Sequence, residues 1–287
     1  DKSQDKARNG AEVKPRGEGI WGVGILEKVL AAVKGLLTKG VLDFATVWLS
    51  RVGHLGLLAA AALGLIFSLI VAIRLDSFMA FLYGLAWVVL LFIVQYVAHR
   101  FVSAGESLIA NNPSALSSQA VLDCLGLLAA LAGLIALTLG AVRSIQGAGV
   151  RFVLFGAALF VLLELFAAAV FNPETISTET GGRQSAGREA IGIIVLFVKG
   201  AMRLVPVLFG IGIAAGFVLL AVDAFGIFGS EFRILAGWRR AIVTGRTIVA
   251  SGLVPFLGYV GFVFAYLAVD VVRAILAVPE KLDALKK

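Results

Sequence analysis

Long apolar runs dominate the chain, and the polar residues are gathered between them. The runs are continuous rather than alternating, which favours helices over the strands of a membrane barrel. Each run has about 20 residues, enough for a helix to rise about 30 Å and cross the hydrocarbon layer. The pattern therefore predicts an all-α, polytopic membrane protein. About six transmembrane helices are expected, at about 53–73, 77–98, 121–142, 152–171, 204–225 and 248–269.

Two further segments have a different pattern, in which apolar and basic residues separate onto opposite faces of a helix. The first covers residues 20–51, and its two faces carry Leu30, Val33, Leu37 and Phe44 against Lys34 and Lys39. A lysine-rich amphipathic helix suits the plane of the membrane interface better than the bilayer interior. We therefore expect an interfacial helix over 20–51 and a second, shorter one over 230–246.

The remaining segments complete the predicted organisation. Residues 1–19 are polar and mixed in charge, so they predict a disordered or extended tail. The transmembrane bundle is expected over 52–273, followed by a cytoplasmic tail over 274–287. The segment 191–203 has two interpretations, because it is too short to span alone and contains basic residues. It forms either a surface helix or the first part of a long helix that continues into the fifth span.

The composition agrees with lipid as the solvent of this chain. Of its residues, 60% are hydrophobic and only 15% are charged, against about 45–50% and about 25% in soluble domains. The net charge is +7, which in a membrane protein indicates anionic lipid headgroups as partners rather than nucleic acid.

The distribution of basic residues predicts an orientation. With six spans, 18 of the 25 Lys and Arg residues lie on the side that carries both termini. The positive-inside rule then places both termini in the cytoplasm, and we expect a bacterial inner membrane. The difference between the two sides depends on the basic N-terminal region, because without that region the two sides carry nearly equal numbers of Lys and Arg residues.

Glu164 is the sharpest candidate for a functional residue. It lies within the fourth span between Leu163 and Leu165, where an ionised carboxylate costs several kcal/mol and usually faces a partner, a cavity or an ion path. Three interpretations stay open: a proton or cation site, a protonated carboxyl in an interhelical hydrogen bond, and a salt bridge to another subunit. Candidate partners within the chain are Ser68, Thr138, Ser251 and Tyr259.

Two histidines and two glycines are weaker candidates. His54 opens the first span and His99 closes the second, so a hairpin would bring both to one membrane face, where they are weak candidates for axial haem ligands. Interfacial imidazoles are the ordinary alternative. Gly212 and Gly216 form a GxxxG pattern that permits close helix packing, within the chain or against another subunit.

Motifs for catalysis or cofactor binding are missing from the sequence. It contains no P-loop, no HExxH and no GxSxG pattern, and its single cysteine, Cys124, cannot form an intrachain disulfide. We therefore expect no enzymatic activity and no cofactor. The leading hypothesis is a non-catalytic membrane subunit that acts as scaffold, anchor or assembly partner, with other membrane protein subunits as its partners. The alternative is a small secondary transporter or channel that uses Glu164 as a proton or cation site.

Overall fold

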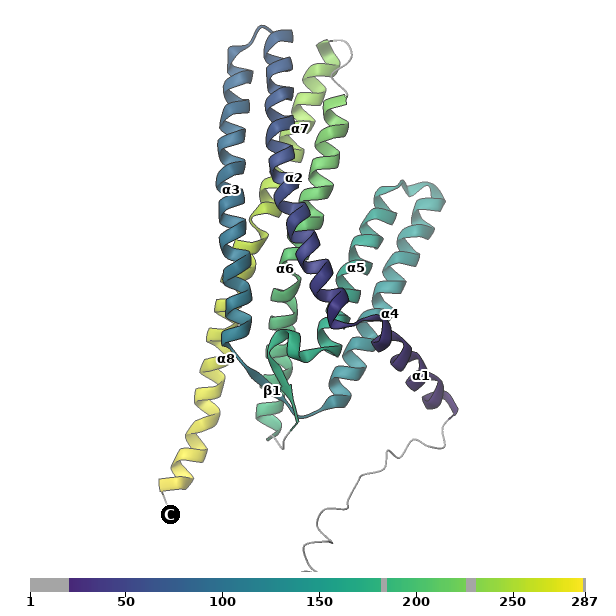
Figure 1. Cartoon of the computed structure of the whole chain (residues 1–287), viewed down its shortest axis with the longest axis vertical. Coiled ribbons are helices and arrows are strands. Elements are labelled where there is room, and N and C mark those ends of the chain that lie inside the picture. Colours follow the sequence, from purple (N-terminus) through teal and green to yellow (C-terminus); the bar gives the residue numbers. More distant parts are fainter. Residues whose placement is uncertain (1–20, 182–184, 226–230, 286–287) are drawn as a thin grey trace, which may run out of the picture. The chain divides into compact units, whose positions relative to one another are not determined.

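The computed structural model describes residues 21–181, 185–225 and 231–285, and it confirms the all-α fold. The predicted tail over 1–19 lies outside the described residues. Eight α-helices are present in the described ranges: α1 (Trp21–Leu36), α2 (Lys39–Arg74), α3 (Phe78–Asn111), α4 (Gln119–Arg143), α5 (Arg151–Phe171), α6 (Ala186–Phe225), α7 (Glu231–Gly252) and α8 (Val254–Leu285) (Figure 1).

The chain divides into two units, one ending at Leu36 and the other beginning at Leu37. In the first unit, α1 is an amphipathic helix. The single helix expected over 20–51 is thus interrupted at Leu37 and Thr38, where Thr38 has an extended backbone (φ −80°, ψ 161°). Gly35 and Gly40 flank this point and lower the helix propensity on both sides. The second half of the expected helix is continuous with the first span, because α2 runs unbroken from Lys39 to Arg74.

Six helices of the described chain are long and apolar enough to cross a membrane, which makes this an integral membrane protein. Their bounds are Lys39–Arg74, Phe78–Asn111, Gln119–Gly147, Arg151–Phe171, Ala186–Phe225 and Val254–Val278. The first five contain the first five predicted spans, apart from the single residue Ser77 at the start of the second. Several helices extend well past the apolar runs that predicted them.

The sixth predicted span, 248–269, differs from the structure because a helix break lies inside it. The first helix, α7, ends at Gly252, and α8 begins at Val254 after the single residue Leu253. Pro255 explains the break, since proline has no N–H to donate and is tolerated only in the first turn of a helix. The apolar run is continuous across this break, so its hydropathy gives no sign of it.

The ambiguous segment 191–203 belongs to a long helix. Residues 186–225 form one continuous α6, and Pro206 lies inside it without ending it. At the other end of the chain, the predicted tail from 274 onward continues α8 as far as Leu285.

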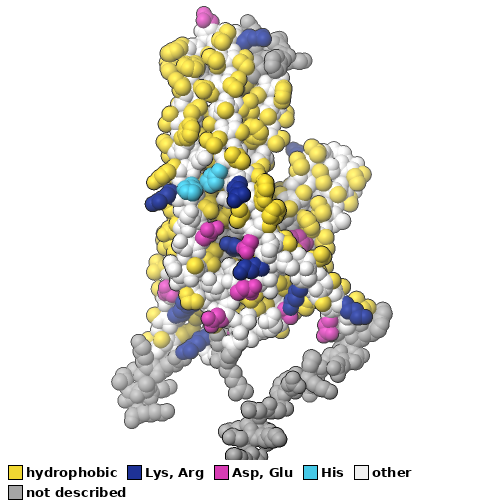
Figure 2. All heavy atoms as spheres, viewed as in Figure 1, with side chains coloured by type: hydrophobic (Ala, Val, Ile, Leu, Met, Phe, Trp, Pro, Cys, Tyr) yellow, Lys and Arg dark blue, Asp and Glu magenta, His cyan; other side chains and the backbone are white. Residues whose placement is uncertain are grey.

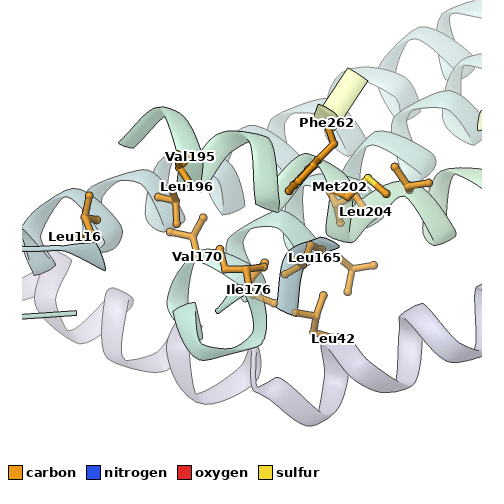
Figure 3. Close-up of a cluster of buried hydrophobic side chains, with 14 of the residues drawn as sticks. Leu42, Leu116, Leu165, Val170, Ile176, Val195, Leu196, Met202, Leu204 and Phe262 are labelled. Carbon is orange, nitrogen blue, oxygen red and sulfur yellow. The ribbon is translucent and has the colours of Figure 1, made fainter. Parts of the chain in front are cut away.

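Within the second unit, α2 packs against α3 and α6, and α6 also packs against α7 and α8 (Figure 1). Helices α4 and α5 form a hairpin that joins this bundle mainly through α5. One hydrophobic core lies where these helices meet (Figure 3) and includes Leu42, Leu165, Val195, Leu204 and Phe262. A second core joins α2, α3, α6 and α7 and includes Leu57, Phe67, Leu91, Ile213 and Ile248.

A small parallel sheet forms at the end of the bundle where α4 and α6 begin. Strand β1 (Ser114–Leu116) pairs with β2 (Thr178–Thr180), with Ser114 opposite Thr178. The link that contains β2 is rich in polar residues, yet Ile176 and Thr178 are buried in it. The sheet satisfies backbone groups that would otherwise be buried without partners.

Charged side chains are unevenly distributed over the second unit. On the face shown in Figure 2, hydrophobic side chains cover the segment on one side of the two histidines, and acidic and basic side chains gather on the other side. The described residues of α2 between His54 and Arg74 carry no charge. His54 and His99 therefore mark one boundary of the apolar band.

Candidate functional site

Glu164 lies on α5 where that helix contacts α4. A Cβ added at Gly133 of α4 would lie 3.2 Å from the Oε1 atom of Glu164, so the glycine makes room for the carboxyl group. Gly126, Gly133 and Gly140 recur every seven residues on this face of α4. At Gly140, an added Cβ would lie 3.1 Å from the Cα of Gly156, so the two backbones are in contact there.

The carboxyl group of Glu164 is partly buried, and the described part of the chain supplies no hydrogen-bond donor to it. Two of the four hydroxyl groups expected as partners are engaged elsewhere: Ser68 donates to the Leu65 carbonyl at 2.8 Å and Thr138 to the Leu134 carbonyl at 2.5 Å. Ser251 packs against Gly212, and Tyr259 against the ring of Phe101. Glu164 is thus a polar group within a spanning helix that lacks an intrachain partner among the described residues.

His54 and His99 are brought together, as the hairpin of the first two spans predicts. Their ring centroids lie 5.7 Å apart in an edge-to-face arrangement, and the His54 ring also packs on Phe209 at 5.1 Å. Imidazole rings at this separation and tilt are in direct contact, which leaves no space between them for a porphyrin. The geometry therefore favours the ordinary interpretation, a packed pair of imidazoles at the edge of the apolar band.

The GxxxG pattern of α6 serves packing within the chain. A Cβ added at Gly212 would lie 2.5 Å from the Oγ atom of Ser251, and one added at Gly216 would lie 2.6 Å from Ile248. Both neighbours belong to α7, so these glycines allow α6 and α7 to approach closely. An intersubunit role for this pair has no support in the geometry.

A buried lysine is the residue that sequence reasoning did not single out as a site. Lys199 of α6 is fully buried, and its Nζ atom donates to the Oγ atom of Ser114 at 2.8 Å and to the carbonyl of Ser177 at 2.8 Å. The Ser114 hydroxyl is also 2.9 Å from the Oγ1 atom of Thr178. Lys199 thus fastens the small sheet to α6. A lysine inside the apolar stretch of 191–203 was the only signal in the sequence.

Glu189 closes the other side of the small sheet. Its carboxylate accepts hydrogen bonds from the backbone N–H groups of Ser117 and Ser118, each at 2.9 Å, and from the Ser117 hydroxyl at 2.5 Å. These groups precede the first turn of α4, where backbone donors have no helical partner. Glu189 therefore ties the start of α4 to the first turn of α6.

Among the described residues, Arg203 and Asp223 of α6 form ion pairs with neighbouring helices of the second unit. Arg203 of α6 contacts Asp43 of α2 at 2.5 Å, and this guanidinium is largely buried. Asp223 of α6 lies 3.5 Å from the Nε atom of Arg240 and accepts a hydrogen bond from the Thr244 hydroxyl at 2.9 Å. These contacts set the register of α6 against α2 and α7.

Among the described residues, no group of three or more His, Cys, Asp and Glu side chains is arranged to hold a metal ion. Comparison with known proteins adds no relative: no protein-family model, no curated protein and no solved structure matches this chain.

Proposed function

We propose that this chain is a non-catalytic membrane subunit, a scaffold or anchor that holds another membrane protein against its α4–α5 hairpin. The observation that carries the proposal is Glu164, a carboxyl group inside a spanning helix with no hydrogen-bond donor among the described residues. A second chain would supply the missing donor.

The free energy of an unpaired carboxyl group in lipid gives the physical reason. An ionised side chain at the centre of a span costs about 2.5–3.5 kcal/mol on translocon-derived scales. Protonation of Glu164 removes much of that cost but leaves a polar group that still lacks a hydrogen bond. A basic or amide side chain on a helix of another subunit would satisfy Glu164 in either state.

The exposed surface of the hairpin provides room for such a helix. Helix α4 packs mainly on α5, so much of its surface faces away from the rest of the chain. Its exposed apolar residues include Leu128, Leu131, Leu134, Ile135 and Leu139. An apolar face with one polar group beside it is the pattern that allows a membrane helix to dock in a defined register.

Transport through Glu164 has less support. Two cavities of the described chain are large: a mainly apolar one of about 830 Å³, lined by residues that include Phe67, Trp87 and Arg246, and one of about 570 Å³ beside the small sheet. Glu164 lines neither of them, so neither provides a water-filled route to this carboxyl group. Helices broken at the substrate site are common in transporters, but α6 continues through Pro206 without a break.

Photocrosslinking from α4 tests the proposal. A photoreactive amino acid at Leu134, next to Gly133 in the sequence, should yield an adduct with a different membrane protein when native membranes are irradiated. Glu164→Leu should reduce that adduct at least about fivefold, because loss of one charge-assisted hydrogen bond is worth about 1.5–3 kcal/mol. Glu164→Gln retains the adduct if a neutral hydrogen bond is sufficient, and loses it if the partner is a cation.

The matched control places the same photoreactive group at Leu55, which is 66% exposed on α2. The yield of any adduct formed from Leu55 should be the same in the unmodified chain and in Glu164→Leu. Adducts from Leu134 that contain only a second copy of this chain would overturn the proposed hetero-complex, and so would an adduct whose yield is unchanged in Glu164→Leu.

The orientation is proposed on the distribution of basic residues. With both termini in the cytoplasm of a bacterial cell, the excess of Lys and Arg faces the anionic inner leaflet. Protease added outside spheroplasts should leave tags at either terminus intact, and it should remove them after the cells are lysed. Removal of a C-terminal tag from intact spheroplasts would contradict this orientation.

A further inference from the structure

A cavity of about 570 Å³, with both polar and apolar walls, lies beside the small sheet, between the start of α6 and the second half of α8. Its polar lining includes Ser114, Ser185, Arg188 and Arg273, and Ile191 and Leu276 form part of its apolar wall. This volume is within the range of about 300–1,000 Å³ that is typical of small-molecule sites.

Among the described residues that line the cavity, two are basic and none is acidic. Arg188 and Arg273 line it directly, and Lys199 lies behind Ser114, whose hydroxyl accepts a hydrogen bond from the lysine. Lys199 and Arg273 are near enough to repel each other electrostatically. Of the described carboxylates nearby, Asp270 pairs with Arg273 at 3.3 Å, and Glu189 is engaged by Ser117 and Ser118.

Lys199 makes this arrangement unusual. It is fully buried, and the two groups to which it donates hydrogen bonds, a hydroxyl and a carbonyl, are uncharged. A buried ammonium group is costly unless an opposite charge lies near it. The described residues place no carboxylate in contact with Lys199, so an anion bound in the adjacent cavity would supply the missing negative charge.

We propose that this cavity binds a phosphate-bearing ligand, with Arg188 and Arg273 contacting the phosphate group, Ser114 lining the wall, and Lys199 behind Ser114 adding a further positive charge. Arginine guanidinium groups pair with phosphate through two parallel hydrogen bonds. The volume exceeds that of a single phosphate ion, so the ligand is either the headgroup of an anionic phospholipid or a soluble phosphorylated compound.

Ligand-induced stabilisation of the purified full-length chain tests the proposal. The chain, kept in an uncharged detergent, is heated with inorganic phosphate, with a short-chain phosphatidylglycerol or with a short-chain phosphatidylcholine, all at equal ionic strength. A ligand that binds only the folded state raises the unfolding temperature with concentration. We expect a rise with phosphate, with phosphatidylglycerol or with both, and none with zwitterionic phosphatidylcholine.

Two variants locate the binding. Arg273→Gln and Lys199→Met should each weaken the apparent affinity about tenfold or more, because each removes a cation worth about 1.4 kcal/mol or more. Arg246→Gln is the matched control, since Arg246 lines the large apolar cavity instead and its loss should leave the response unchanged. If Lys199→Met does not fold, the response of Arg273→Gln alone shows whether the ligand binds in this cavity.

The outcomes separate the two sources of phosphate. A rise with phosphatidylglycerol alone identifies a lipid headgroup site, and a rise with inorganic phosphate identifies a site for a soluble compound. The proposal is overturned if neither compound raises the unfolding temperature of the unmodified chain. It is equally overturned if Arg273→Gln responds as strongly as the unmodified chain.

Discussion

Gly210→Ala is expected to destabilise the folded protein by about 3 kcal/mol, the upper end of the usual cost of overpacking. Gly210 is buried on α6 where this helix crosses α2, and a Cβ added there would overlap the backbone carbonyl of Leu49. A flexible side chain could rotate away from such a contact, but a helix backbone cannot. The two helices would therefore have to separate, which would disturb the apolar packing around them.

Gly261→Ala provides the matched control for Gly210→Ala. A Cβ added at Gly261 of α8 has no neighbour within 4 Å, so the same substitution adds a methyl group to open space. For Gly261→Ala we expect no loss of stability, and a gain of up to about 1 kcal/mol because alanine has a higher helix propensity than glycine. The temperature at which half of each detergent-solubilised variant stays monodisperse measures the difference. Equal temperatures for the two variants would contradict the close α2–α6 contact.

The transmembrane helices could be predicted because lipid imposes a simple requirement on the sequence. A helix in hydrocarbon satisfies its own backbone and needs about 20 apolar residues, and these runs are visible without any tertiary information. Glu164 was found by the same reasoning, as a charge within such a run. The closeness of His54 and His99 also followed from the sequence, because the short link between the first two spans requires a hairpin.

The features that the sequence did not reveal depend on contacts between distant segments. Strands β1 and β2 have three residues each and pair across the whole α4–α5 hairpin, so neither has a pattern of its own. The importance of Lys199 depends on that pairing, since its partners Ser114 and Ser177 belong to or adjoin the two strands. The break at Leu253 was hidden for another reason, because hydropathy does not register the missing N–H of Pro255.

The ion pair between Asp43 and Arg203 leads to the second large effect, and the two partners should not be equivalent. The side chain of Arg203 is 17% exposed and that of Asp43 is 42% exposed. The Nε atom of Arg203 is buried and has no hydrogen-bond partner among the described residues. Removal of Asp43 therefore leaves the more buried charge unpaired, whereas removal of Arg203 leaves a carboxylate that water can reach.

We expect Asp43→Ala to cost about 3 kcal/mol, near the lower end of the range for a broken buried pair. Arg203→Met should cost less, about 1–2 kcal/mol, because the apolar replacement keeps much of the volume and the exposed carboxylate is solvated. The double variant should be more stable than Asp43→Ala alone, since it contains no buried unpaired guanidinium. Denaturation of the four proteins by a graded detergent series forms a double-mutant cycle that isolates the coupling.

Arg240→Met is the control for this cycle, because the Arg240 side chain is 65% exposed and Asp223 retains its hydrogen bond from Thr244. An exposed pair of this kind contributes about 0–1 kcal/mol. If Asp43→Ala is no more destabilising than Arg240→Met, the contact between Asp43 and Arg203 does not hold α2 to α6. If the double variant is less stable than Asp43→Ala, the unpaired guanidinium is not the source of the cost. A loss in Asp43→Ala that Arg203→Met partly restores would show that burial of an unpaired charge, rather than a missing contact, determines how strongly these two helices are coupled.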